Sequence, residues 1–110
     1  MRVNLKTKNI DLTSSIEILA EKKLVMPIEK LISGIDKKAD LFFDIELGRT
    51  TKHHSKGKIW RCEAQLDLPG IKSMIRAESL AESLRAAVDE VKSEILSEIK
   101  KYKERTRVQG

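Results

Sequence analysis

The sequence is poor in cysteine, aromatic residues and long apolar runs, and each shortage excludes a class of protein. Its 110 residues include a single cysteine, Cys62, so no disulfide can form within the chain, which fits a reducing compartment. The N-terminus has no apolar run of signal-peptide length, and no window approaches the ~20 apolar residues of a membrane span. We therefore expect a soluble cytoplasmic protein without a membrane partner.

Aromatic side chains make up 4 % of the chain, and this shortage excludes one way of binding nucleic acid. Modules that bind single strands stack the bases on aromatic rings of an exposed sheet face. The pattern offers Phe42 alone for that purpose, and one ring is not a stacking platform. The five glycines are scattered, so the sequence has neither a phosphate-binding glycine loop nor a GxxG clamp.

Charged residues, in contrast, are abundant. They make up 35 % of the chain, and 22 Lys and Arg against 17 Asp and Glu leave a net charge of +5. A basic surplus favours nucleic acid or another anionic surface as the partner, although it says nothing about the fold. The apolar fraction of 40 % suffices for one modest core in a single small domain.

Hydrophobic periodicity predicts four strands, each apolar on one face and polar on the other. A sheet of this kind has one covered face and one solvated face. A polar connection from Gly48 to Gly57 separates the second strand from the third, and the turn residues Pro69-Gly70 separate the third from the fourth. The expected strands are Val3–Lys8, Leu41–Leu47, Trp60–Leu68 and Ile71–Glu78.

Two helices are predicted from capping boxes and from apolar residues spaced three and four apart. The first begins at Ser14, with Glu17 completing its capping box, and extends to Ile32. Pro27 lies inside this helix, and because proline removes a hydrogen bond and clashes with the preceding turn, we expect a kink or break near Val25-Met26.

The second helix is expected from Leu80 to Lys103, after a capping box of Ser79 and Glu82. At 1.5 Å per residue it would be about 36 Å long, so its end should protrude beyond the sheet. The element order is then β-α-β-β-β-α. We predict an α+β two-layer sandwich in which both helices cover one face of a four-stranded sheet, with one domain over 1–104 and a basic tail over 105–110.

Candidate catalytic groups do not converge in this pattern. The alternation points Cys62 inward, which indicates a core residue rather than a nucleophile. His53-His54 could contribute to a metal site, but no Cys/His cluster supplies the remaining ligands. We expect no enzyme activity, metal, cofactor or small-molecule substrate.

Carboxylates on the solvated sheet face could act as an acid/base pair, but basic residues lie among them. The mixed signs favour a lattice of exposed cross-strand salt bridges. The residues concerned are Asp44, Glu46, Glu63, Asp67, Arg61, Lys72 and Arg76.

Basic residues are concentrated in two stretches. The first lies between Gly48 and Cys62, where no acid interrupts Arg49, Lys52, Lys56, Lys58 and Arg61. The second is the end of the last helix, where Glu104 alone accompanies Lys100, Lys101, Lys103, Arg105 and Arg107. Cations there could simply stabilise the helix dipole or aid solubility. The alternative is phosphate contact from the helix face, which suits structured RNA better than a single strand.

The order and spacing of several motifs resemble a known family. The run KGKIWRCEAQLDLPGIKSMIRAESLAESLRAAVDEVKSEILSEIKKYKER is similar to the short ribosome hibernation-promoting factors, also called ribosome-associated inhibitor A, protein Y or sigma-54 modulation proteins. The sharpest pieces are LDLPG, IRAES, RAAVDE and IKKYK, and the opening strand followed by NIDLTSSI is also similar. The resemblance covers nearly the whole chain.

The resemblance implies the β-α-β-β-β-α fold, which is similar to a double-stranded-RNA-binding domain, and a non-enzymatic role. Family members bind the small ribosomal subunit between head and body, over the tRNA sites and the messenger channel. They block tRNA and mRNA there and preserve idle ribosomes under stress. Basic residues of both helices contact 16S rRNA. We expect the same here, from a protein that is monomeric off the ribosome.

Carried over by position, Lys23 and Lys30 match basic positions of the family's first helix, and Lys101 matches one late in the second. Basic residues that the family often has near Glu94 and Ser97 are missing, so the helix end and the 49–61 loop should contribute more. The expected RNA-binding residues are Lys23, Lys30, Arg49, Lys52, Lys56, Lys100, Lys101, Lys103 and Arg105.

Two other functions stay open from the residues themselves. One is a generic structured-RNA-binding module that acts away from the ribosome, and the other is a small enzyme using Cys62 or His53-His54. Long-form relatives carry a second C-terminal domain that dimerises ribosomes. None follows here up to Gly110, so we expect the chain not to pair ribosomes by itself.

Overall fold

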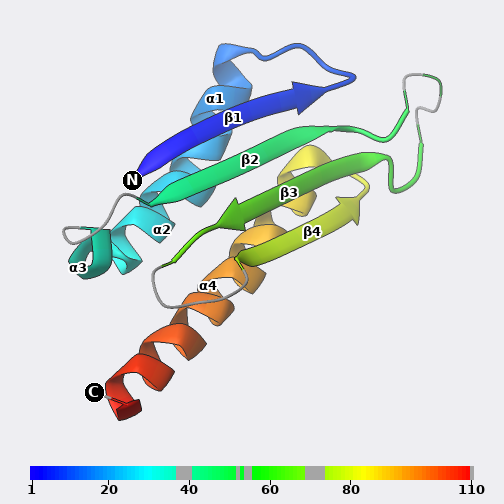
Figure 1. Cartoon of the computed structure of the whole chain (residues 1–110). Helices are drawn as coiled ribbons and strands as arrows, with labels where there is room; N and C mark the ends of the chain where they lie inside the picture. The colour runs from blue at the N-terminus through cyan, green and yellow to red at the C-terminus, as the bar shows by residue number, and fades with distance from the viewer. Residues whose placement is uncertain (37–40, 52, 54–55, 69–73, 110) are drawn as a thin grey trace.

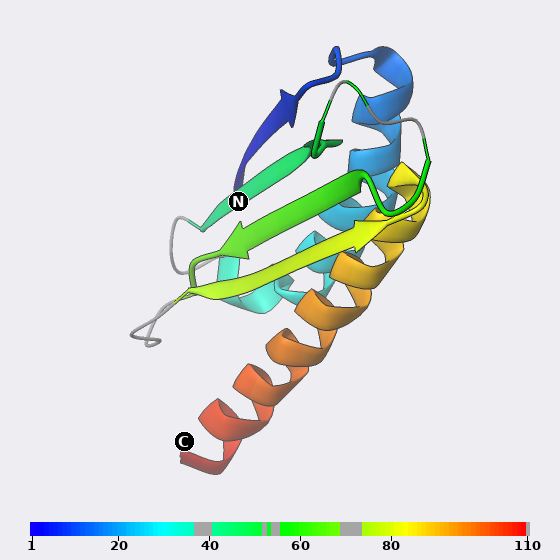
Figure 2. The same cartoon turned by 90° about the vertical axis from the view of Figure 1, so that its right-hand side faces the viewer.

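A four-stranded sheet forms one layer of the computed structural model, and the helices form the other (Figure 1). The structure describes residues 1–36, 41–51, 53, 56–68 and 74–109. The strands are β1 (Arg2–Lys8), β2 (Phe42–Arg49), β3 (Trp60–Leu66) and β4 (Ile75–Ala81), and they lie in this order across the sheet. Figure 2 shows all helices on one side of it, so the predicted α+β sandwich is confirmed.

Pairing in the sheet follows from the connections between the strands. β1 and β2 are parallel, because the first helical segment crosses between them, whereas β2–β3 and β3–β4 are antiparallel. Inward residues of β2, such as Phe43, Ile45 and Leu47, are buried, and outward residues such as Asp44 are exposed. The expected Pro69-Gly70 turn and the predicted beginning of the fourth strand lie outside the described residues.

The first helical segment consists of α1 (Ser14–Ala20), the π-helical turn η1 (Glu21–Val25), α2 (Met26–Leu31) and the short α3 (Ser33–Asp36). Its N-cap is Thr13 rather than the predicted Ser14, because the Thr13 Oγ1 accepts a hydrogen bond from the Ile16 N–H at 3.3 Å.

The irregularity expected at Val25-Met26 is present as a π turn instead of an open break. The Met26 N–H donates to the Glu21 carbonyl, five residues back. Pro27 has no N–H, and its ring would meet the carbonyl of Lys23 in a regular helix. A wider turn just before the proline accommodates that ring, and the helical path continues.

The last helix, α4 (Leu84–Gln109), begins and ends later than predicted. The capping box at Ser79 is wrong, because residues up to Ala81 pair with β3 in the sheet. Ser83 performs the cap, and its Oγ accepts from the Ala86 N–H at 3.1 Å. Residues 105–109, assigned to a tail, continue the helix. The 26 residues of α4 span about 39 Å, and the helix projects past the sheet (Figure 1).

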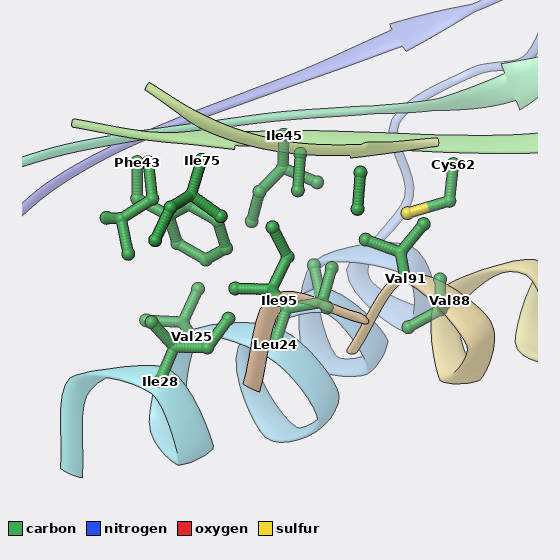
Figure 3. Packing of buried hydrophobic residues seen from close by; sticks show 14 of the residues in the cluster. Leu24, Val25, Ile28, Phe43, Ile45, Cys62, Ile75, Val88, Val91 and Ile95 are labelled. Atoms are coloured by element: carbon green, nitrogen blue, oxygen red, sulfur yellow. The ribbon is translucent and has the colours of Figure 1, made fainter. Parts of the chain in front are cut away.

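One hydrophobic core fills the space between the two layers (Figure 3). The helices contribute a stripe from each segment, including Leu24 and Ile28 from the first and Val91 and Ile95 from α4. Cys62 points from β3 into this core and is 0 % exposed, as predicted. α4 packs mainly under β3 and β4, and the first segment packs beside it under β1 and β2.

Candidate nucleic-acid interface

The end of α4 presents cations on a helix that the core holds in place. Ile99 and Tyr102 are buried, and between and beyond them Lys100, Lys101 and Arg105 are exposed, with Lys103 half-buried. The Lys101 Nζ lies 3.3 Å from the Glu98 Oε1, an exposed pair one helical turn apart. Such a pair contributes little to stability, so a phosphate can compete for the lysine. The anchored stripe therefore fixes the direction in which these cations project.

Lys23 and Lys30 lie on the first helical segment but in different surroundings. Lys23 is half-buried, and its Nζ lies 3.4 Å from the Asp89 Oδ1 of α4, so its charge is partly compensated. Lys30 is exposed on α2. The first segment and α4 run in roughly the same direction, and α4 continues well past the end of α2, the helix that carries Lys30 (Figure 1). Lys22, which the sequence argument did not single out, is also exposed.

The connection between β2 and β3 carries the first basic stretch of the sequence, which we call the loop cluster. It lies at the other end of the sheet, near the beginning of α4 (Figure 1). Lys56 is exposed, whereas Lys52 lies outside the described residues. Arg49 is half-buried, and its guanidinium stacks 5.5 Å above the Trp60 ring. As far as their residues are described, the two basic clusters of the sequence are thus separated along a molecule whose longest dimension is 51 Å, and they do not merge into one patch.

Arg61, which continues the loop cluster in the sequence, belongs instead to an ionic network on the solvated sheet face. Its Nη1 lies 2.8 Å from Glu46 and its Nε 3.1 Å from Glu78, and its Nη2 also contacts Glu63. Arg76 lies 3.2 Å from Glu63 and 3.6 Å from Glu78. The predicted salt-bridge lattice is confirmed for Arg61, Arg76, Glu46 and Glu63, and Glu78, which was not predicted, also belongs to it. Asp44 and Asp67 are exposed outside these contacts, and Lys72 lies outside the described residues.

Protonation in this network follows from the contacts. The pKa of Arg61 is raised, chiefly by its hydrogen bond with Glu78, against partial burial. Burial alone would raise the pKa of Glu63, but the hydrogen bond from Gln65 and the interactions with Arg61 and Arg76 outweigh it and lower that pKa. Arg61 is therefore engaged by carboxylates and is not a candidate for pairing with phosphate.

The candidate catalytic groups are not arranged for catalysis in the described part of the chain. Burial raises the pKa of the Cys62 thiol to about 12, so the reactive thiolate is not formed at neutral pH. Within the described ranges, no three His, Cys, Asp or Glu side chains are grouped to hold a metal ion. His53 is exposed, and His54 lies outside the described residues. None of the helices, over the residues described, has the length and apolar character to cross a membrane.

The model of one protein family, sigma 54 modulation protein / S30EA ribosomal protein, matches residues 3–107. The chain belongs to this S30EA family. Family members are non-enzymatic, ribosome-associated factors of the hibernation and subunit-interface type, and the chain is one of them.

Solved structures agree with the family assignment. The N-terminal domain of Protein Y from Thermus thermophilus has a TM-score of 0.64 and 27 % identity, with 93 % of this chain and 99 % of that chain covered. A ribosomal subunit interface protein from Coxiella burnetii has the same fold, with a TM-score of 0.67, 22 % identity, and 94 % and 98 % of the two chains covered. No curated protein sequence matches the chain significantly.

In this S30EA-family protein, the side chains of the expected set divide by environment. One group is exposed on α2 and at the end of α4, another is exposed in the loop, and a third is engaged with neighbouring side chains. The first group is Lys30, Lys100 and Arg105, the second is Lys56, and the third is Lys23, Arg49 and Lys101, which pairs with Glu98. Lys103 is half-buried at the end of α4, and Lys52 lies outside the described residues. The helix end is thus the densest group of projecting cations among the expected residues.

Proposed function

We propose that the protein binds the small ribosomal subunit over the tRNA and mRNA path and thereby inhibits translation in idle or stressed cells. The observation that carries this proposal is the cationic end of α4, held by Ile99 and Tyr102 and projecting beyond the sheet. The family is described as S30EA ribosomal protein, and the neighbour from Coxiella burnetii is named a ribosomal subunit interface protein, which supports the same kind of association. The cytoplasm is the compartment in which such a protein meets ribosomes.

Binding follows from general polyelectrolyte behaviour. Each lysine or arginine that pairs with a phosphate of 16S rRNA releases condensed counterions, so affinity falls as salt rises. Phosphate contacts position the domain without reading sequence, and the folded body fills space that tRNA and mRNA need. Inhibition is therefore steric, and the bound form contains one copy of the chain.

The domain that binds is the α+β sandwich with the whole of α4. Residues 1–104 contain all of the sheet and most of that helix, and residues 105–109 continue the helix by a little more than one turn. In this proposal the basic end acts as a continuation of the domain.

The test is cosedimentation with small subunits over a range of salt concentrations. Lys100→Glu combined with Lys101→Glu should remove most binding at moderate salt, and the double variant Lys100→Ala, Lys101→Ala should reduce the log–log salt slope by about 1.5. The matched control is Lys6→Glu with Lys8→Glu, which makes the same charge change on exposed positions of β1. The control variant should bind almost as well as the wild type.

Three outcomes contradict the proposal. Binding that is absent at low salt or indifferent to salt removes the electrostatic mechanism. Equal losses for the two Lys→Glu double variants show dependence on net charge alone. Equal affinity for free duplex RNA and for small subunits would favour a generic structured-RNA-binding module that acts away from the ribosome.

A further inference from the structure

Charged side chains of α4 are sorted onto two sides of the helix. Residues three or four apart are neighbours on a helix surface, so they form rows along it. One row carries three lysines and no acid, and we call it the basic row. Another begins with three glutamates, and we call it the acidic row. The basic row is Lys92, Leu96, Lys100 and Lys103, and the acidic row is Glu90, Glu94 and Glu98.

Contacts with neighbouring elements show which way each row faces. Asp89 precedes the basic row by three residues, and its Oδ1 lies 3.4 Å from the Lys23 Nζ of η1. Leu96 of the same row is half-buried and packs against the core. Glu90 instead accepts a hydrogen bond from the Ser79 hydroxyl of β4. The basic row therefore faces the first helical segment, and the acidic row begins on the side of the edge strand β4.

Lys92 is the lysine of the basic row that the sequence argument did not single out. Its side chain is half-buried, and within the described part of the chain no hydrogen bond or ion pair engages it. A lysine in such a position packs its aliphatic stem on apolar surface and keeps its ammonium at the surface. Because the stem is already partly immobilised, less side-chain entropy is lost when the ammonium binds an anion.

The acids of α4 that adjoin the basic row do not cancel its charge. Asp89 is engaged by Lys23. Glu104 is exposed and follows Lys100 by four residues, so it offsets part of the charge at the end of the row. Arg85, four residues before Asp89, adds a further exposed cation at the other end. The row thus keeps a cationic surplus over its whole length.

The acids of the first helical segment lie on its other side. Glu21 and Val25 line an apolar hollow against β1. Glu29 follows Val25 by four residues and therefore lies on the same side. Lys23, which contacts Asp89, is on the side that faces α4. Both helical elements therefore present cations where they meet, and their glutamates are turned away from that meeting line.

This arrangement suits the phosphates of a folded RNA. Lys92 and Lys103 are 11 residues apart, which corresponds to about 16 Å along α4. Cations spread over that length can contact several phosphates of one RNA segment, and each contact releases counterions. The acidic row would repel the same phosphates. The two rows therefore favour one rotation of the domain about the axis of α4 on the RNA.

We propose that the RNA-binding surface continues from the end of α4 along the basic row to Lys92, and that the acidic row faces away from the RNA. Lys92 contacts a backbone phosphate of the RNA segment that engages Lys100 and Lys103. The inference rests on the proposed function, since it names a further residue and the side of α4 with which the protein holds the small subunit.

The experiment is cosedimentation of the full chain with small subunits over a range of salt concentrations. Lys92→Gln should weaken binding roughly three- to tenfold at moderate salt and reduce the log–log salt slope by about 0.7 to 0.9. Lys92→Arg should keep the affinity and the slope, because a guanidinium also binds phosphate. The matched control Lys6→Gln, on an exposed position of β1, should bind almost as well as the wild type.

A charge swap separates position from net charge. Lys92→Glu combined with Glu94→Lys leaves the net charge at +5 and moves the cation to the acidic row. This variant should lose more affinity than Lys92→Gln, and urea unfolding checks that each variant is folded. A swap variant that is folded and binds as tightly as the wild type, or more tightly, overturns the inference.

Two further results also decide against it. One is an equal effect of Lys92→Gln and Lys6→Gln, and the other is a loss in Lys92→Arg as large as that in Lys92→Gln. If the Lys100→Glu, Lys101→Glu variant loses binding while Lys92→Gln does not, the proposed function stands and this inference fails. Absence of binding by the wild type would remove the proposed function itself, and this inference with it.

Discussion

Lys23 and Asp89 join the first helical segment to α4 across the helical layer, with 3.4 Å between the Lys23 Nζ and the Asp89 Oδ1. The pair is partly exposed, so its contribution to stability is small. Its larger effect is on binding, because it holds a lysine that the family resemblance assigns to RNA. An RNA phosphate must compete with the Asp89 carboxylate for that lysine.

Asp89→Asn is predicted to raise affinity for the small subunit by roughly two- to fivefold at low salt, because Lys23 no longer has a competing carboxylate. Cosedimentation measures the change. Asp67→Asn, on an exposed position of the sheet side, removes the same charge and should have a smaller effect. Equal gains in the two variants would assign the effect to net charge and remove Lys23 from the site.

Gly48→Ala is predicted to destabilise the protein by about 2 kcal/mol or more, because overpacking forces the backbone to move. A Cβ at Gly48 would lie 2.1 Å from the backbone oxygen of Lys8, its partner on β1. Urea unfolding measures the difference. The matched control is Gly34→Ala, where nothing lies within 4 Å of the added Cβ. That variant should be neutral or more stable, and equal losses at both positions would contradict the steric explanation.

Cys62 should react with a thiol reagent only when the protein unfolds, because its Sγ is buried and its pKa is raised to about 12. Labelling is followed with and without urea. Ser97→Cys adds an exposed thiol on α4 and provides the control, which should label rapidly in the folded protein. Rapid labelling of Cys62 in the native protein would contradict its position in the core.

The same thiol should make stability fall at high pH. Its folded pKa lies above its ordinary value of 9.0, so the unfolded state loses the proton first as pH rises. The contribution is complete below about pH 9 and decreases by roughly 1.4 kcal/mol per unit toward pH 12. The measurement is the free energy of unfolding against pH for the wild type and for Cys62→Ala. A curve of the same slope for both would contradict the prediction.

Arg61→Gln is predicted to lower stability by about 1–2 kcal/mol at neutral pH, since several carboxylates lose a hydrogen-bonded cation. The pKa of Glu63 is lowered in the folded protein, so this stabilisation is present above its ordinary value of 4.5 and is lost as pH falls. Urea unfolding at neutral and at acidic pH should therefore show a smaller difference between the variants in acid.

Small-subunit binding by Arg61→Gln provides the second readout. It should be unchanged, because the carboxylates of the sheet face engage Arg61. A loss of binding as large as that of the α4 variants would place Arg61 in the interface.

Much of the fold could be predicted from local sequence patterns, and the errors of that prediction have a common cause. Alternation located the strands, and spacing located both helices. The residues Ser79 to Ala81 satisfy a helix-capping pattern and also a strand pattern, and pairing with Trp60, Arg61 and Cys62 on β3 decides between them. Backbone hydrogen bonds to a strand far away in the sequence outweigh a local capping preference. A local sequence pattern does not indicate which distant strand will pair.

The candidate site, too, could be predicted only in part from the local sequence. Runs of lysine and arginine in the sequence marked which residues carry charge, but not which carboxylate or ring each would meet. Arg49 and Arg61 belong to one basic run in the sequence. In the structure Arg49 stacks on Trp60, and Arg61 lies among glutamates of three strands.

By itself, the sequence determined the element order, the apolar stripe of α4, the inward position of Cys62 and the cationic character of the chain's end. These depend on the periods of strands and helices and on composition, which are local properties. The tertiary structure alone decided that the two basic clusters lie at opposite ends, that Lys23 meets Asp89, and that apolar surface stays open beside β1. Those outcomes depend on which distant segments pack together, because packing determines the neighbours of each charge and the apolar surface that stays uncovered.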